Sequence, residues 1–417
     1  MTLAANPVIP LKRLAAVMPS NVDKHSVDGE QQVSLCNYVD VYKNERITDA
    51  LNFMEATATE AQVSRFTLQA HDVIVTKDSE EPTDIGIPAY VPSSLPGVVC
   101  GYHLAVLRPS DERLYGGYLH WALQSAEVKA YYSTAATGIS RYALGIGDLG
   151  MTPIHVPSRT EQVRIANFLD EQTARIDALI AEKERLMVLL SEQRLSIAER
   201  VMADSASGTK AKLGFHADFL AGYAFPSDEF SRDESDIPLL RGVNVAPASI
   251  RWDDVVYWRR DYDTSLERFR LQAGDVVFGM DRPWISSGAR VAMIDADSAG
   301  AFLLQRVCRL RGGSKMRQRF LFYALSSDAF RQSIEVDLTG VSVPHISPEQ
   351  VLGFKVPVLT PEEQDVRCAE ADRQTEALQG LGTHTDGLLN RLREYRSSLI
   401  SAAVTGQLDL STFKDVQ

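Results

Sequence analysis

The stretch YLHWALQSAEVKAYYSTAATGIS at residues 118–140 returns in altered form as FLFYALSSDAFRQSIEVDLTGVS at residues 320–342. Sliding the sequence by 202 positions lays residues 118–162 over 320–364 without a gap, and ten of these 45 pairs are identical. Upstream, FTLQAHDVIVTKDS (66–79) lies over FRLQAGDVVFGMDR (269–282). Because the matches recur in one order at nearly one spacing, the chain is predicted to hold two copies of one unit of about 200 residues.

Each copy is predicted to begin with a mixed globular part. The runs DVIVT, HLAVLR, DVVFG and RVCRLR are short, rich in β-branched residues and bounded by Gly, Pro or Asp, which is typical of strands. Residues 118–132 and 319–334 have the spacing of helices.

A long helix is predicted after each globular part. From Ile165 onward, positions that alternate by four and three are apolar in seven of ten cases, which is typical of a coiled-coil seam. The apolar seam residues are Ile165, Leu169, Ile176, Leu179, Leu186, Leu190 and Ile197 in the first helix, and Leu378, Leu381, Leu388, Leu392 and Leu399 in the second. Gly380, Gly382 and Gly387 predict a kink or interruption of the second helix between Gln379 and Gly387.

These patterns predict an α+β fold with an internal two-fold repeat, in which two similar mixed α/β domains are held apart by two long antiparallel coiled-coil helices. At ~1.5 Å per residue, about 40 helical residues span ~60 Å, so the helices are predicted to act as a spacer. The predicted boundaries are 1–158 for the first domain, 159–205 for the central helix, 206–359 for the second domain and 360–417 for the C-terminal helix and tail.

Composition excludes several classes of protein. The 417 residues carry a net charge of −12, which argues against a protein that coats nucleic acid through positive charge alone. The four cysteines form no CxxC pair, so zinc and redox motifs are not indicated and the thiols are expected to be reduced. No run approaches the ~18 apolar residues of a membrane helix, so we expect a cytoplasmic protein without membrane contact.

One stretch has the spacing of a dinucleotide-binding motif. Gly145, Gly147 and Gly150 form a literal GxGxxG, but an extended segment, MTPIHVP, follows where a dinucleotide site needs a helix. A turn is therefore the favoured interpretation. No phosphate loop, HExxH or GxSxG is present, so no catalytic residue, metal ligand or cofactor is predicted in this chain.

Two repeated loops are the best candidates for contact with nucleic acid. Residues 76–80 and 279–284 follow a predicted buried strand in each copy, and 138–142 and 340–345 form a second pair. The candidate DNA-binding residues are Lys77, Ser79, Glu80, Arg141 and Tyr142 in the first copy, and Arg241, Asn244, Arg282, Trp284, Arg317, Arg319, Ser342 and His345 in the second. Ordinary turn chemistry and a solvated charged surface, with arginines paired to acids, stay open as alternatives.

The same residues resemble the specificity subunit of type I restriction-modification systems. The resemblance is carried by the duplicated plan, TKDSEEPTDIGIPAYV (76–91), the TGxS turn, EQVRIANFLDEQTARIDALIAEKERLMVLL (161–190) and RSSLISAAVTGQLDL (396–410). It implies two target recognition domains, each of which reads half of a split, asymmetric site in double-stranded DNA.

The resemblance also implies partners. Two methyltransferase subunits carrying S-adenosylmethionine would dock on the helices, and two restriction subunits with ATP- and Mg²⁺-dependent translocation would join them. Two other hypotheses are a standalone DNA methyltransferase or nuclease, and a coiled-coil adaptor that never touches DNA.

Overall fold

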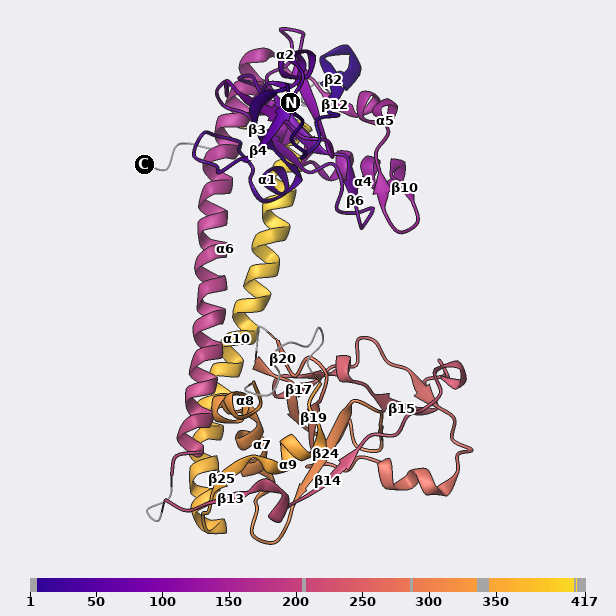
Figure 1. Ribbon diagram of the computed structural model, residues 1–417, viewed down its shortest axis with the longest axis vertical. Helices are drawn as coiled ribbons and strands as arrows, with labels where there is room; N and C mark the ends of the chain where they lie inside the picture. Colours follow the sequence, from indigo (N-terminus) through magenta and orange to yellow (C-terminus); the bar gives the residue numbers. More distant parts are fainter. Residues whose placement is uncertain (1–5, 205–207, 286–287, 336–344, 409, 411–417) are drawn as a thin grey trace. The chain divides into compact units, whose positions relative to one another are not determined.

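The computed structural model describes residues 6–204, 208–285, 288–335, 345–408 and 410 (Figure 1). It consists of two compact units: unit 1 comprises Met1–Glu182 with Leu388–Gln417, and unit 2 comprises Lys183–Gly387. Each unit contains one globular part and a segment of each long helix, α6 (Arg159–Val201) and α10 (Pro361–Val404).

The main sheet of unit 1 has the antiparallel order β2-β9-β5-β7, with β2 at Ala15–Pro19, β9 at Leu104–Pro109, β5 at Val73–Thr76 and β7 at Pro88–Tyr90. Strand β5 begins with three apolar residues because both of its faces are covered: Val73 and Val75 belong to one core cluster and Ile74 to another. The other strands are β1 (Val8–Pro10), β3 (Gln31–Cys36), β4 (Met54–Ala58), β6 (Asp78–Ser79), β8 (Val98–Cys100), β10 (Thr137–Gly138), β11 (Tyr142–Ala143) and β12 (Pro153–His155).

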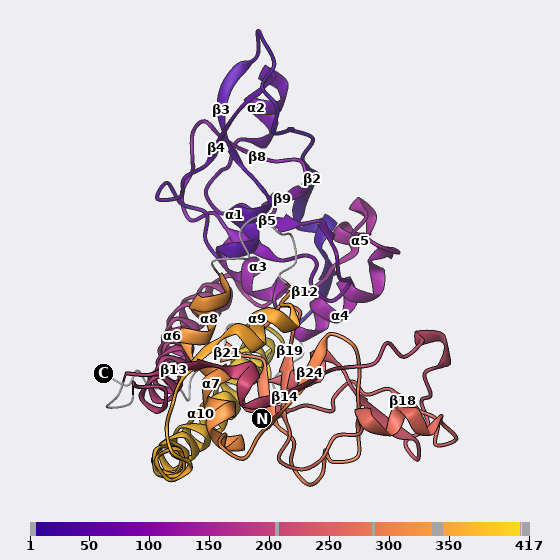
Figure 2. The same cartoon turned by 60° about the horizontal axis from the view of Figure 1, so that its bottom comes forward.

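The short helices of unit 1 are α1 (Tyr38–Lys43), α2 (Glu60–Phe66), α3 (Gly116–Leu123), α4 (Ala126–Ala135) and α5 (Ile146–Met151). The β4-β3-β8 sheet and α2 lie at one end of its globular part, away from α3, α4 and α5 (Figure 2). The helical stretch predicted at 118–132 is two helices, because the Ser125 hydroxyl caps α4 by accepting from the backbone N–H of Val128.

Unit 2 repeats this plan around the sheet β14-β24-β19-β22, with β14 at Ala217–Ala221, β24 at Val307–Gly312, β19 at Val276–Gly279 and β22 at Val291–Met293. Its other strands are β13 (Lys210–Lys212), β15 (Ile237–Leu240), β16 (Val245–Ala246), β17 (Ser249–Ile250), β18 (Tyr257–Trp258), β20 (Trp284–Ile285), β21 (Gly288–Ala289), β23 (Phe302–Leu303) and β25 (Lys355–Pro357), and its short α-helices are α7 (Gln318–Ser326), α8 (Asp328–Glu335) and α9 (Pro348–Gly353). The four predicted strand runs are therefore confirmed as β5, β9, β19 and β24.

A buried glutamine starts each long helix in the same way. The Gln162 side chain is fully buried; it accepts from the N–H of Tyr115 at 2.8 Å and donates to the carbonyl of Pro157 at 2.9 Å. Gln364 accepts from the N–H of Arg317 at 2.8 Å and donates to the carbonyl of Leu359 at 3.0 Å. Gln162 and Gln364 are equivalent in the repeat and make equivalent hydrogen bonds, so each globular part joins its long helix in the same way.

The two long helices are antiparallel within each unit. In unit 1, Ile165 and Leu169 share a core with Ile400 and Val404, and the guanidinium of Arg396 bonds to Asp177. In unit 2, Arg200 donates to Gln374 at 2.6 Å and Arg367 to the carbonyl of Val201 at 3.1 Å. The α+β fold with antiparallel paired helices is confirmed.

Two expectations about glycines are wrong. Helix α10 runs from Pro361 to Val404 without a break at Gly380, Gly382 or Gly387. The segment with the GxGxxG spacing is not a turn, because it forms helix α5, with Gly145 at its N-cap.

The four cysteines are free and buried. Burial raises the pKa of the Cys368 thiol to about 12. No helix among the described residues is long and apolar enough to cross a membrane.

Candidate nucleic-acid interface

In unit 1 the two loops selected from the sequence meet in one small sheet. Strand β11 pairs with β10 on one side and with β6 on the other, so that Tyr142 lies opposite Ser79 and Ala143 opposite Asp78. The candidates Lys77, Ser79, Glu80, Arg141 and Tyr142 are thereby gathered in one place.

A tight hairpin presents part of this surface to solvent. Gly138 has φ +151°, and a Cβ there would lie 2.0 Å from the carbonyl oxygen of Arg141, so only glycine allows the turn. Ile139 at the tip is 96% exposed, and Ser140 and Arg141 are also exposed. The hairpin can therefore contact a partner molecule without displacing other parts of unit 1.

Asp78 organises the polar groups beneath the hairpin. Its Oδ2 lies 2.7 Å from Nδ1 of His103 and 3.9 Å from Nζ of Lys77. Arg141 Nη2 lies 3.5 Å from the same His103 nitrogen. Ser79 is buried and its hydroxyl accepts from the N–H of Glu81 at 3.2 Å, so its role here is to shape the loop.

Tyrosines surround this polar cluster. The ammonium of Lys77 lies 4.8 Å from the ring centroid of Tyr102, which is 51% exposed. Tyr38 stacks on Tyr42 at 5.6 Å. Burial and the nearby carboxylate of Asp84 raise the pKa of Tyr38, so its phenol stays protonated and able to donate a hydrogen bond at neutral pH.

Unit 2 builds the corresponding site around Asp281. Arg306 Nη1 lies 2.8 Å from one oxygen of this aspartate, and His345 Nδ1 lies 2.5 Å from the other. Burial opposes ionisation of Asp281, but the hydrogen bonds from His345 and Arg306 outweigh it and lower its pKa. Of the other candidates here, Arg282 has φ +44°, Trp284 packs near Phe330 and Ser342 lies outside the described residues.

Sequence reasoning missed the histidine and the arginine that hold these aspartates. When HLAVLR is laid over RVCRLR, His103 falls opposite Arg306. Both residues immediately precede the strand beside the aspartate loop. The repeat therefore contained the information that links these two side chains to the aspartates: the offset of 203 positions that relates His103 to Arg306 also relates Asp78 to Asp281.

Two of the candidate residues in unit 2 bond to other residues of the same unit. Asn244 is 1% exposed, and its amide donates to the carbonyls of Arg251 and Asp254, both at 2.9 Å. Arg241 forms an ion pair with Asp254 at 2.7 Å. The structure gives both side chains a part in holding the loop 241–254 together.

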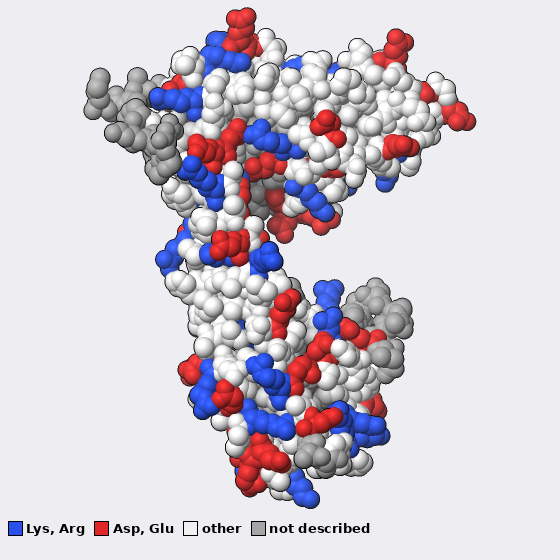
Figure 3. Space-filling view, turned by 90° about the vertical axis from the view of Figure 1, so that its left-hand side faces the viewer, with Lys and Arg blue, Asp and Glu red and all other residues white. Residues whose placement is uncertain are grey.

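The basic stretch 306–319 is neutralised by acids from elsewhere in unit 2. Arg317 pairs with Asp365 at 2.9 Å and Arg319 with Asp372 at 2.5 Å, so these two candidates join α7 to α10. The remaining arginines of the stretch also have partners: Arg306 with Asp281, Arg309 with Asp218 and Arg311 with Asp275. Figure 3 accordingly shows basic and acidic side chains interspersed on the face it presents, without a large patch of one sign.

The predicted seam residues differ in burial. Ile165, Leu169, Ile176, Leu190, Ile197 and Leu399 are buried, Leu186, Leu378, Leu388 and Leu392 are partly buried, and Leu179 and Leu381 are each 44% exposed. The last two therefore lie on the outer surface of their helices. Among the described residues, no cluster of three or more His, Cys, Asp or Glu side chains could hold a metal ion.

Comparison with known proteins finds relatives that match parts of this chain. The chain is 35% identical over 162 residues to the type I restriction enzyme EcoAI specificity subunit of Escherichia coli, which covers 39% of this chain and 27% of that protein. It is 26% identical over 264 residues to the type I restriction enzyme MjaVIII specificity subunit of Methanocaldococcus jannaschii, covering 59% of this chain and 60% of that one. These relatives are type I specificity subunits. The resemblance drawn from the sequence is confirmed, although the matches span less than two thirds of either relative.

A solved structure supports the fold along its whole length. It is described as the structural basis of complex assembly and conformational transition of a type I restriction-modification system, and it matches with a TM-score of 0.70 at 16% identity, over 98% of this chain and 100% of that one. No family model matches the chain.

Proposed function

We propose that this chain is the DNA-recognition subunit of a type I restriction-modification complex and that each unit reads one half of a split, asymmetric target. One observation carries the proposal. Both units place an aspartate after the same buried strand and hold it with the side chain that immediately precedes the same neighbouring strand, yet the exposed side chains around it differ. One scaffold with two sets of exposed side chains suits the reading of two different half-sites.

The chemistry of the loops fits double-stranded DNA. Arg141 and Lys77 supply the positive charge that phosphates or guanine edges require, and the exposed carboxylate of Glu80 can accept from the amino group of cytosine. In unit 2, Arg282 and His345 occupy the corresponding loops. The aspartates would orient the cations beside them.

The helices would dock two methyltransferase subunits, which carry S-adenosylmethionine, and two restriction subunits that use ATP and Mg²⁺. Exposed apolar side chains support a protein partner on the helices: Leu179, Val188 and Leu189 on α6, and Val366 and Leu381 on α10 are each at least 44% exposed. The chain itself would act without a cofactor and without catalysing the reaction.

Exchange of residues 1–158 for the same domain of another specificity subunit tests the proposal. Sequencing of methylated adenines in the host genome should show one half-site replaced and the other unchanged. A change in both halves would contradict independent reading by the two units. Binding of S-adenosylmethionine by the purified chain alone would favour a standalone methyltransferase, and a DNA footprint unchanged by the exchange would favour an adaptor.

A further inference from the structure

The repeat extends to the ends of the two long helices. The offset of 202 positions that aligns the globular parts also lays the end of α6 over the end of α10, with Glu192 over Glu394 and Ser196 over Ser398. Arg194 of unit 2 therefore corresponds to Arg396 of unit 1.

In unit 1 this arginine is fully paired. Arg396 Nε lies 2.8 Å and Nη2 3.1 Å from the two carboxylate oxygens of Asp177, and Nη2 also bonds to Glu45. Its guanidinium lies 5.9 Å from the ring centroid of Trp121. Two acids and an aromatic ring thus hold the charge of a side chain that is only 18% exposed.

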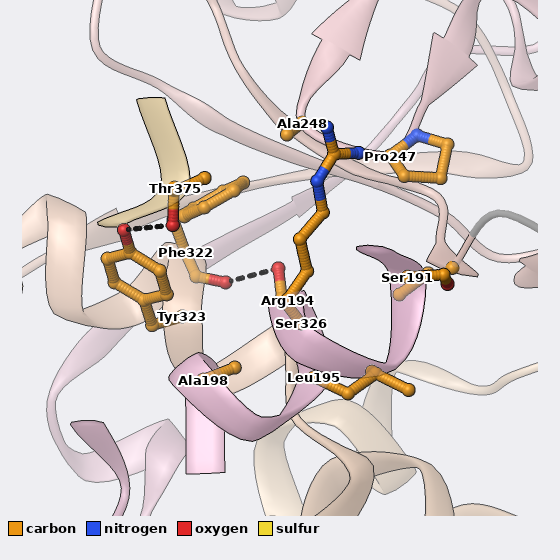
Figure 4. A pocket seen from close by; sticks show the side chains of 12 residues that line it. Ser191, Arg194, Leu195, Ala198, Pro247, Ala248, Phe322, Tyr323, Ser326 and Thr375 are labelled. Atoms are coloured by element: carbon orange, nitrogen blue, oxygen red, sulfur yellow. Dashed lines mark hydrogen bonds between the residues drawn. The ribbon is translucent and has the colours of Figure 1, made fainter. Parts of the chain in front are cut away.

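In unit 2 the equivalent arginine has no such partners. Gln379 occupies the position of Asp177 in the repeat and Tyr323 that of Trp121. The guanidinium of Arg194 points toward Pro247 and Ala248, which cannot form an ion pair (Figure 4).

The guanidinium of Arg194 is also unusual in its hydrogen bonds. Among the described residues, four arginines have a buried Nε without a hydrogen-bond partner. Arg241, Arg290 and Arg309 each bond through another guanidinium nitrogen. Arg194 alone of the four has no partner at any nitrogen within the part of the chain that the structure describes.

Two pockets adjoin this guanidinium, and Arg194, Pro247 and Ala248 line both of them. The larger has a volume of about 320 Å³ and is also lined by Arg251, Gln379 and Asp386. The smaller, of about 60 Å³, is lined by Leu195, Ala198 and Phe322 (Figure 4). The larger pocket has room for one side chain beside Arg194.

We propose that an acidic side chain, Asp or Glu, of a protein partner enters the larger pocket and pairs with Arg194. This inference rests on the proposed function, because the partner is a methyltransferase subunit. Unit 1 shows that carboxylates are the chemistry this position of the repeat accepts. A carboxylate can bond two guanidinium nitrogens at once. The partly apolar walls fit a side chain better than the backbone of a stiff duplex, so DNA phosphate is the competing outcome and not the proposal.

Two substitutions in the full chain test the inference against assembly with the methyltransferase subunits. Arg194→Gln should weaken that association about 10- to 100-fold, the range expected for loss of a charged hydrogen-bonded pair, and should leave the thermal midpoint of the chain unchanged because no internal bond is lost. Gln379→Asp should copy unit 1: it should raise the thermal midpoint by supplying an internal carboxylate, and it should weaken association by occupying Arg194. Arg396→Gln is the matched control, since it should lower the midpoint.

Each contrary outcome overturns the inference. Unchanged association in both variants would show that no partner uses Arg194. Unchanged association with weaker DNA binding and a flatter salt dependence for Arg194→Gln would assign the site to phosphate. An unchanged midpoint for Gln379→Asp would show that the site does not accept a carboxylate, and this measurement needs no partner. Failure of the unaltered chain to assemble would instead contradict the proposed function.

Discussion

The aspartate after the buried strand is held by His103 in unit 1, and by Arg306 together with His345 in unit 2. Just before the same strand the two units do not differ: Asp72 accepts two hydrogen bonds from Arg108, and Asp275 accepts two from Arg311. The buried pair preserves the scaffold, whereas the exposed pair varies with the loop around it. Of these two sites, the one that differs between the units is therefore the one that a bound molecule could reach.

The largest expected effect tests whether the buried ion pair stabilises the two units equally. Asp72→Asn and Asp275→Asn should each destabilise the chain by about 3 kcal/mol, because each leaves an arginine beside the core without its counter-charge. Urea denaturation followed by circular dichroism measures both. Asp111→Asn, at an exposed pair with Arg113, is the control and should leave the denaturation midpoint unchanged. A large cost in one unit and none in the other would show that the scaffolds differ after all.

A second prediction concerns acid. Burial, with repulsion from Arg46 and Arg396, lowers the pKa of His120 to about 3 in the folded chain, against ~6.5 when unfolded. Between these values only the unfolded chain binds the proton, so the stability of unit 1 falls by about 1.4 kcal/mol per pH unit as the pH decreases. Unit 2 has Phe322 at the equivalent position.

His120→Phe should therefore remove this acid sensitivity. Denaturation midpoints of the variant and the unaltered chain should diverge as the pH is lowered from about 6.5 to about 4.5, where the variant should be more stable by roughly 2–3 kcal/mol relative to their difference at neutral pH. A parallel pH dependence of the two proteins would mean that His120 is protonated without cost in the folded state.

The sequence was sufficient for the elements and their repetition, because both follow from local patterns. Strands such as 73–76 are rich in β-branched residues, and the seams have helical spacing. Ion pairs could not be predicted in this way. The acids that neutralise Arg317 and Arg319 lie 48 and 53 residues further along the chain, and only the fold brings them together. The continuity of α10 was also not predictable from local patterns, because the low helix propensity of its three glycines favours a break there.

The candidate site could be predicted only in part, because its place in the repeat is a local pattern and its strand pairing is not. Both loops of unit 1 were identified by their place in the repeat, but the pairing of Tyr142 with Ser79 was not. Asn244 has the residue type of a base reader, yet it is buried as a loop support, and burial cannot be read from residue type.

A third prediction separates exposed from paired arginines. In the assembled complex, Arg141→Ala should weaken DNA binding and flatten the slope of log K against log salt by up to about 1, the loss of one phosphate contact. Arg317→Ala should leave that slope unchanged, because its guanidinium is paired with Asp365. Equal effects on the slope would show that this ion pair opens when DNA binds.

The smallest expected effect compares the two long helices at equivalent positions. Where α10 has Gly380, Gly382 and Gly387, α6 has Ala178, Ile180 and Arg185. A Cβ at Gly380 or Gly387 would meet nothing within 4 Å, so Gly380→Ala and Gly387→Ala should each stabilise the helix by up to about 1 kcal/mol.

Gly382 should behave differently, because a Cβ there would lie 3.4 Å from Nη2 of Arg194. Contact with the end of this side chain takes up part of the gain in helix propensity, so Gly382→Ala should stabilise slightly less than Gly380→Ala or Gly387→Ala. Urea denaturation of the three single variants measures the difference. An equal gain at all three positions would show that Arg194 can withdraw from α10 without cost, whereas a smaller gain at Gly382 would show that this glycine makes room for the arginine which, in unit 1, has acids to hold it.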